Sequence, residues 1–233
     1  SICGPNSKRI LKKLIPDLDL SDDKFPHMSF KEARIGKINC RVMRISFTGE
    51  LSYEINIQAS YGKSLWEKCM KAGKEFNITP YGTETMHLLR AEKGFIIVGQ
   101  DTDGTMTPID LQMDWIVSKK KYDFIGKRSL YRSDTMREDR KQLVGLLTDN
   151  PNEILEEGSQ IVSELNQSPL EMLGHVTSSY FSPNLKKSIA LAVVKGGKSM
   201  LGKKLYVPME EKNIKVIIVD PVFLDKENNR LNA

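Results

Sequence analysis

Apolar residues recur at helical spacing in three segments of the first half of the chain. In the first segment Ile10, Leu11 and Leu14 share one face, and Pro5 stands near the first position, where a helix tolerates proline. The second has apolar residues three to four positions apart, as an amphipathic helix does. The third ends at Gly94, a residue suited to a left-handed helix cap. The pattern predicts helices over residues 6–14, 60–76 and 83–92.

Apolar and polar residues alternate between the first two of these segments, which is typical of strands with one buried face. One such run contains Ile38, Cys40 and Val42, and another spans residues 45–57. The stretch before them, residues 16–31, is polar and is predicted to be a connection. The mixture of helices and strands predicts an α+β fold for this half of the chain.

The pattern changes after the charged stretch 132–141. Short segments rich in β-branched and apolar residues follow one another, separated by Gly, Pro and Asn. Their regular spacing is typical of a small barrel or sandwich, and we expect an antiparallel β-barrel. The expected strands lie within residues 143–148, 159–164, 173–180, 188–194, 203–209 and 214–223. We therefore predict two domains, residues 1–135 and 140–233.

Composition excludes several function classes. With 39% apolar and 28% charged residues, the 233-residue chain has the composition of a globular protein. No apolar run approaches the roughly 20 residues needed to cross a bilayer, so no membrane span is expected. The net charge of +5 arises from basic residues interspersed with acids, which predicts no nucleic-acid groove. Three widely spaced cysteines, Cys3, Cys40 and Cys69, indicate neither a disulfide framework nor a zinc site, and favour a cytoplasmic location.

Two sequences resemble the end of a phosphate-binding loop but lack its first glycine. Residues 62–64 and 197–199 both read Gly-Lys-Ser, yet the position five residues earlier is Ile57 in one case and Ala192 in the other. No G-x-G-x-x-G occurs, so the chain carries no nucleotide-binding fingerprint of its own. The histidines are isolated and are predicted to be structural: His27, His87 and His175.

The segment F-T-G-E, residues 47–50, places a glycine and a carboxylate where a strand begins. Glycine lets a backbone turn sharply or approach a ligand closely. From these residues alone two interpretations of Glu50 remain open. It is either a solvated turn residue, as most turn-edge glutamates are, or a carboxylate aimed into a pocket.

Five ordered blocks of sequence resemble the aminomethyltransferase superfamily, which includes the T-protein of glycine cleavage. F-T-G-E-L-S-Y-E-I is similar to the family segment Y-T-G-E-x-G-x-E-I, and L-R-A-E-K-G is similar to L-R-x-E-x-G. Together the blocks cover almost the whole chain, so chance does not explain them. They lie at residues 47–55, 89–94, 107–117, 124–130 and 173–194.

Within the superfamily, the details are most similar to the C-terminal region of the α subunit of heterotetrameric sarcosine oxidase. Leu51 and Ser52 follow Glu50 where the T-protein pattern has Asp-Gly. Residues 82–85, Gly-Thr-Glu-Thr, also depart from the T-protein pattern. The chain opens on Ser1 without a methionine, and we expect it to be a fragment whose first domain is incomplete at its N-terminus.

The resemblance implies a fold and a ligand: a tetrahydrofolate-binding aminomethyltransferase-like domain followed by a small antiparallel β-barrel. Glu50 stands at the family position that accepts the two parallel N–H donors of the pterin. The resemblance also implies folate contacts for Trp115, Arg90 and Phe47, although Trp115 could be a core residue and Arg90 could pair with a nearby glutamate. The family's catalytic aspartate lies upstream of the matched blocks, so no catalytic residue is expected in this chain.

The resemblance further implies the chemistry and the partners. In the oxidase, a flavin takes a hydride from sarcosine, and tetrahydrofolate captures the one-carbon unit as 5,10-methylenetetrahydrofolate. Flavin and NAD are expected only in missing segments or in partner subunits, so this chain alone should be inactive. The alternatives are an aminomethyltransferase whose partner is a lipoyl carrier protein, and a non-catalytic folate-binding regulator.

Overall fold

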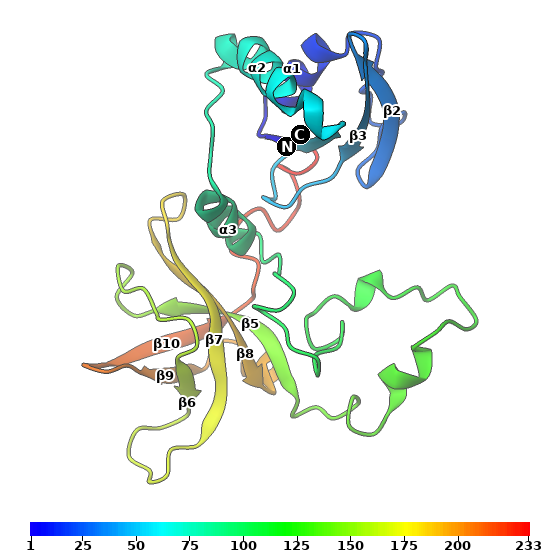
Figure 1. Cartoon of the computed structure of the whole chain (residues 1–233). Coiled ribbons are helices and arrows are strands. Elements are labelled where there is room, and N and C mark those ends of the chain that lie inside the picture. Colours follow the sequence, from blue (N-terminus) through cyan, green and yellow to red (C-terminus); the bar gives the residue numbers. More distant parts are fainter. The chain divides into compact units, whose positions relative to one another are not determined.

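The computed structural model describes residues 1–233, which form two compact units (Figure 1). Unit 1 contains residues 1–90 together with the C-terminal residues 225–233. Unit 2 contains residues 91–224. Each unit is described by itself below.

Unit 1 contains a four-stranded antiparallel sheet in the order β1-β4-β3-β2. The strands are β1 (Ile2–Cys3), β2 (Ser29–Ile35), β3 (Ile38–Arg44) and β4 (Ser52–Asn56). The alternation predicted β3 and β4 but not β2. The prediction of a polar connection through residue 31 is wrong at its end, because β2 is an edge strand with mostly exposed polar residues and little apolar signal.

The helices of unit 1 lie where the periodicity predicts them. They are α1 (Ser7–Leu14), α2 (Gly62–Gly73) and α3 (Thr83–Glu92), the last of which continues into unit 2. Short 3₁₀ turns, η1 (Ala59–Tyr61) and η2 (Lys74–Phe76), flank α2 and complete the segment predicted as one helix. Figure 1 shows α1 and α2 beside the sheet. The apolar core of this unit is formed by Leu11, Ile15, Leu20, Phe25, Ile35, Cys40, Val42, Leu51 and Tyr53.

The C-terminal tail belongs to unit 1. Leu231 is buried, and the carbonyl oxygen of Arg230 accepts a hydrogen bond of 2.9 Å from the backbone N–H of Leu51. Both chain ends therefore lie in this unit, as Figure 1 shows. This return of the chain places residues 225–233 beside the segment that carries Glu50.

Unit 2 is built around a closed antiparallel barrel in the strand order β10-β5-β8-β7-β6-β9. All the strands predicted from the spacing are confirmed. They are β5 (Lys141–Thr148), β6 (Gln160–Val162), β7 (Met172–Ser182), β8 (Lys187–Lys195), β9 (Lys204–Pro208) and β10 (Asn213–Val219). Inward-facing valines, leucines and isoleucines fill the barrel, which explains the strong apolar signal of these segments.

Residues 93–140 form turns and short 3₁₀ helices that precede the barrel: η3 (Asp114–Ile116) and η4 (Lys127–Tyr131). Gly94 adopts φ +73°, as expected of a left-handed cap after α3. A Cβ at this glycine would lie 2.6 Å from the carbonyl oxygen of Pro221. The close approach of the segment that follows β10 is therefore a second reason for glycine at this position. A last 3₁₀ turn, η5 (Gly197–Met200), contains one of the two Gly-Lys-Ser sequences.

The compact units divide the chain at different residues from the domains proposed from sequence, 1–135 and 140–233. Trypsin is expected to cut first at the exposed lysines 119–121. We expect the two fragments to co-elute on native gel filtration, because residues 105–110 and 225–233 each bond to the part of the chain carried by the other fragment. A resistant fragment that starts near residue 140 and separates from residues 91–113 would contradict this expectation and favour the proposed domains.

Candidate functional site

The predicted carboxylate lies in the loop between β3 and β4. Gly49 takes φ +82°, a conformation that favours glycine, and its N–H donates to Ser46 Oγ at 3.0 Å. Thr48 and Leu51 on either side are buried. Because the backbone is fixed before and after it, the loop gives Glu50 a defined direction.

Glu50 forms an ion pair with the C-terminal tail. Arg230 Nη1 donates to Glu50 Oε1 at 3.0 Å, and the side chain of Glu50 is 22% exposed. The second carboxylate oxygen, Oε2, makes no hydrogen bond within the chain. Glu50 is thus partly exposed and held on one side only, which differs from both a freely solvated turn residue and an unpaired carboxylate in a pocket.

The other residues predicted to contact folate lie on different elements. Phe47 is half-buried and shares the loop of Glu50, so these two residues are brought together. Arg90, near the end of α3, is completely buried. Trp115 lies in η3 of unit 2 and is 72% exposed, so the interpretation of a core tryptophan is wrong.

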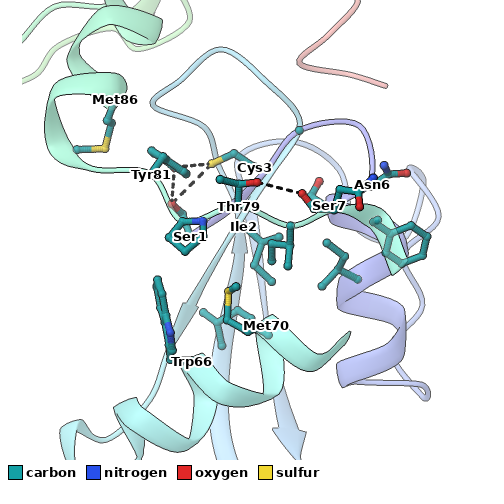
Figure 2. Close-up of a pocket in the computed structure, with 18 of the residues that line it drawn as sticks. Ser1, Ile2, Cys3, Asn6, Ser7, Trp66, Met70, Thr79, Tyr81 and Met86 are labelled. Carbon is teal, nitrogen blue, oxygen red and sulfur yellow. Dashed lines mark hydrogen bonds between the residues drawn. The ribbon is translucent and has the colours of Figure 1, made fainter. Parts of the chain in front are cut away.

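Unit 1 also contains a cavity of about 540 Å³ next to β1, α2 and the segment before α3 (Figure 2). None of the four predicted folate residues lines it. At one end Tyr81 Oη lies 2.9 Å from Cys3 Sγ and 3.2 Å from Ser1 Oγ. This cavity is separate from the Glu50 loop.

Two buried carboxylates of unit 2 attach the end of α3 and the segment after it to the barrel. Asp101 accepts hydrogen bonds from the hydroxyls of Thr177 and Ser178 on β7. Glu92 accepts from Ser182 at the end of β7 and, at 2.8 Å, from Asn184 Nδ2. Since the hydroxyl partners lie in the block V-T-S-S-Y-F-S-P-N, part of the family resemblance corresponds to structural contacts within unit 2.

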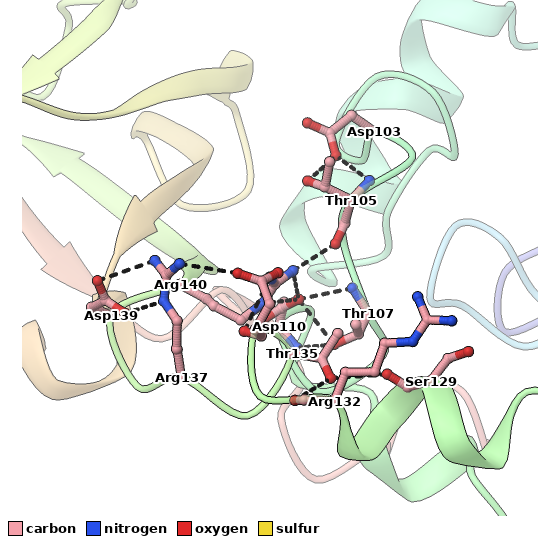
Figure 3. Close-up of polar contacts among 11 residues, drawn as sticks. Asp103, Thr105, Thr107, Asp110, Ser129, Arg132, Thr135, Arg137, Asp139 and Arg140 are labelled. Atoms are coloured by element: carbon pink, nitrogen blue, oxygen red, sulfur yellow. Dashed lines mark hydrogen bonds and ion pairs between the residues drawn. The ribbon is translucent and has the colours of Figure 1, made fainter.

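A third buried carboxylate, Asp110, attaches the loop before η3 to the start of β5. Arg140 donates to both carboxylate oxygens of Asp110, with N···O distances of 2.9–3.1 Å, and the two side chains are 10% and 3% exposed. Arg140 also donates to the Thr105 carbonyl oxygen (Figure 3) and to Asp134. The charged stretch 132–141 is therefore bonded to the preceding loop.

The protonation of Asp110 provides a test of this contact. Burial raises the pKa of Asp110, but the hydrogen bonds from Arg140 and Thr107 outweigh burial and hold the pKa below the ordinary 3.8. A carboxyl whose folded pKa is depressed contributes stability above its unfolded pKa, and this contribution is lost as pH falls through the folded pKa. We expect acid unfolding below about pH 3.8 to be steeper in the wild type than in Asp110→Asn, as measured by circular dichroism. Equal slopes would contradict the assignment.

Sequence reasoning missed Arg230, the three buried carboxylates and the Tyr81–Cys3 pair. Arg230 is 180 residues from Glu50, and no local pattern relates the two. Asp101 and Asp110 resemble solvated loop acids in the sequence. The only usable signal was the run of hydroxyl residues on β7, whose buried hydroxyls require partners.

Comparison with known families identifies the class of protein. The GCVT N-terminal domain matches residues 1–121, which is more than half of the chain. The glycine cleavage T-protein C-terminal barrel domain matches residues 141–225. The chain therefore belongs to the glycine cleavage T-protein (GCVT) family, as the sequence blocks predict.

Individual relatives carry two different names. The sarcosine oxidase α subunit of Corynebacterium sp. (strain P-1) is 49% identical over 99% of this chain, and that of Rhizobium meliloti is 38% identical over 100%. An aminomethyltransferase of Caldanaerobacter subterraneus is 34% identical over 97%. The structure of aminomethyltransferase T from Bartonella henselae, 21% identical, superposes with a TM-score of 0.78 over 95% of this chain and confirms the fold.

The chain is shorter than these relatives. It spans 24% of each sarcosine oxidase α subunit and 58% of the aminomethyltransferases of Caldanaerobacter and Bartonella. None of its helices has both the length and the apolar character that a membrane crossing requires.

Proposed function

We propose that this chain is the tetrahydrofolate-binding part of a sarcosine oxidase α subunit. The main support is its high identity to two such subunits over nearly all of its length. In this role the chain holds tetrahydrofolate so that the one-carbon unit released by oxidative demethylation of sarcosine is captured as 5,10-methylenetetrahydrofolate. We expect a cytoplasmic location.

The Glu50 loop fits a reduced pterin. A carboxylate accepts two parallel N–H donors as a planar, charge-assisted pair, and Glu50 Oε2 makes no competing hydrogen bond within the chain. Oε1 accepts the hydrogen bond from Arg230 with one lone pair and keeps a second lone pair for a pterin N–H. The side chain of Arg230 is 45% exposed and so has room to move aside for the ligand. Phe47 provides apolar surface in the same loop.

Trp115 and Arg90 contribute to different degrees. The exposed indole of Trp115 presents a flat face suited to stacking on the folate aromatic system. Arg90 is completely buried and would have to rearrange to reach the folate glutamate tail. We therefore assign folate binding mainly to Glu50, with Phe47 of the same loop as a supporting contact and Arg90 as the weakest candidate of unit 1. Trp115, in unit 2, stays a separate candidate that rests on the family resemblance.

Tetrahydrofolate, when bound, supplies the nitrogen nucleophiles that accept the one-carbon unit. The part played by this chain is to bind and orient the pterin and to exclude water, since effective one-carbon transfer depends on proximity. The chain has no nucleotide-binding fingerprint, so flavin and NAD are assigned to other segments or to flavin-bearing partner subunits. No residue of this chain is assigned a catalytic role.

A second candidate is an aminomethyltransferase, supported by the Caldanaerobacter relative. A third is a non-catalytic folate-binding regulator. Affinity purification of the tagged protein from its own cells distinguishes them. Recovery of flavin-bearing subunits supports the oxidase, a lipoylated carrier protein supports the aminomethyltransferase, and neither partner with bound folate supports the regulator.

The proposed ligand is tested by equilibrium dialysis of the purified chain with folinic acid, a stable reduced folate. We expect saturable binding of one folate per chain. Absence of saturable binding would contradict the assignment of tetrahydrofolate to this chain.

A further inference from the structure

The C-terminal tail holds the side chain of Arg230 beside the proposed pterin ligand Glu50. The backbone of Arg230 is fixed at both ends, since its carbonyl oxygen accepts from the N–H of Leu51 and its own N–H donates to Asp225 Oδ2 at 3.1 Å. The next residue, Leu231, is buried. Arg230 is therefore anchored next to the Glu50 loop, and both belong to unit 1.

The guanidinium of Arg230 has N–H groups left for a ligand. Only Nη1 takes part in a hydrogen bond, the one to Glu50 Oε1 at 3.0 Å. A guanidinium carries several N–H donors in a planar fork and no acceptor. Because the side chain is 45% exposed, the group can keep its bond to Oε1 and turn another N–H toward a bound molecule. Arginine is suited to this kind of planar contact at two points.

Together the side chains of Glu50 and Arg230 present acceptor, acceptor and donor in a row. Oε2 of Glu50 makes no hydrogen bond within the chain, Oε1 keeps a second lone pair, and the remaining N–H groups of Arg230 lie on the side of Oε1. The edge of a reduced pterin has the complementary order: the 2-amino group donates, the N3–H donates and the 4-oxo group accepts. The opposite orientation would bring the guanidinium against the second hydrogen of the 2-amino group, where donor meets donor.

We propose that Arg230 is a specificity-determining residue of the folate site and donates a hydrogen bond to the 4-oxo group of the pterin, while Glu50 accepts from the 2-amino group and N3–H. This inference rests on the proposed function, because it names a second residue of the same site. Arg230 then decides between a 4-oxo and a 4-amino pterin, since a 4-amino group places a donor against the guanidinium.

The test uses folinic acid and its 4-amino-4-deoxy analogue, 5-formyltetrahydroaminopterin. The two compounds differ at position 4 and in the hydrogen on N3. They carry the same glutamate tail, so the ratio of their dissociation constants cancels effects on that tail. Calorimetric titration of the full chain is expected to show that the wild type binds folinic acid more tightly than the analogue by at least about tenfold.

Arg230→Met keeps an apolar stem but removes every N–H donor of the side chain. It is expected to weaken folinic acid binding by at least about tenfold and to leave the affinity for the analogue unchanged or higher, so the preference falls by about tenfold or more. Arg230→Lys retains a donor cation and should restore part of the preference. Lys226→Met removes the same charge from an exposed residue of the same tail and should keep the wild-type preference. Thermal melts check that all three variants are folded.

A purely structural role of Arg230 predicts a different result, because Arg230→Met would then weaken the binding of both compounds equally. An unchanged preference in Arg230→Met, or an equal fall of the preference in Lys226→Met, would overturn this inference alone. Absence of folinic acid binding by the wild type would contradict the proposed function, and this inference with it. The two failures are therefore distinguishable.

Discussion

Arg140→Ala is expected to lower the free energy of unfolding of unit 2 by about 3–5 kcal/mol. The guanidinium contacts both oxygens of Asp110, a carboxylate whose side chain is only 3% exposed. Its removal leaves the Asp110 charge buried without its cation, which is far more costly than the loss of an exposed ion pair. The backbone N–H of Leu143 also donates to the Asp110 carbonyl, so the loss extends to the start of β5.

Arg137→Ala is the matched control because Arg137 lies in the same charged stretch and contacts Asp139 (Figure 3) and Asp134. These side chains are all more than half exposed, so the expected loss is roughly 0–1 kcal/mol. Urea unfolding followed by circular dichroism gives both free energies, and hydrogen exchange locates the loss at residues 105–113 and 141–146. Equal destabilisation by the two substitutions would contradict the account of Asp110 as a buried, Arg140-dependent group.

Glu50→Gln is expected to weaken folate binding by about 10- to 150-fold, which corresponds to roughly 1.5–3 kcal/mol for hydrogen bonds to a charged group. Glutamine keeps the size of the side chain but presents an NH₂ group to the pterin donors, so one charge-assisted bond is replaced by a donor–donor clash.

Folding should suffer little from the same substitution. The ion pair with Arg230 joins side chains that are 22% and 45% exposed, and partly exposed pairs of this kind contribute roughly 0–1 kcal/mol. A thermal melt of unliganded Glu50→Gln close to that of the wild type is expected. A large fall in its melting temperature would show that Glu50 is chiefly a structural partner of Arg230.

The barrel was predictable because its strands are apolar and punctuated by Gly, Pro and Asn. β8 is buried on both faces, so its residues 189–194 form a continuous apolar run that can be read without any distant contact. The edge strand β2 was not predictable in the same way, since its apolar residues are few and Phe30 is exposed, with only Ala33 and Ile35 turned away from solvent. Local pattern therefore reveals strands in proportion to how much of them is buried.

The candidate site was predictable only in part. The resemblance singled out Glu50, and the glycine before it indicated the sharp turn that the structure contains. Arg230 and the cavity beside Tyr81 arise from contacts between segments far apart in the chain, which periodicity cannot register. Asp110 has the sequence context of a solvated loop acid. It is buried because the chain places it against Arg140, 30 residues later in the sequence, and no local pattern indicates that contact.

The central claim, that Glu50 is a folate ligand, is tested most directly by titrating folinic acid into three proteins side by side: wild type, Glu50→Gln and Glu54→Gln. Glu54, on β4, provides the same substitution four residues away, and its carboxylate forms no ion pair or hydrogen bond within the chain. We predict that Glu54→Gln binds like the wild type and that Glu50→Gln binds about 10- to 150-fold more weakly. Wild-type affinity in Glu50→Gln would contradict the claim.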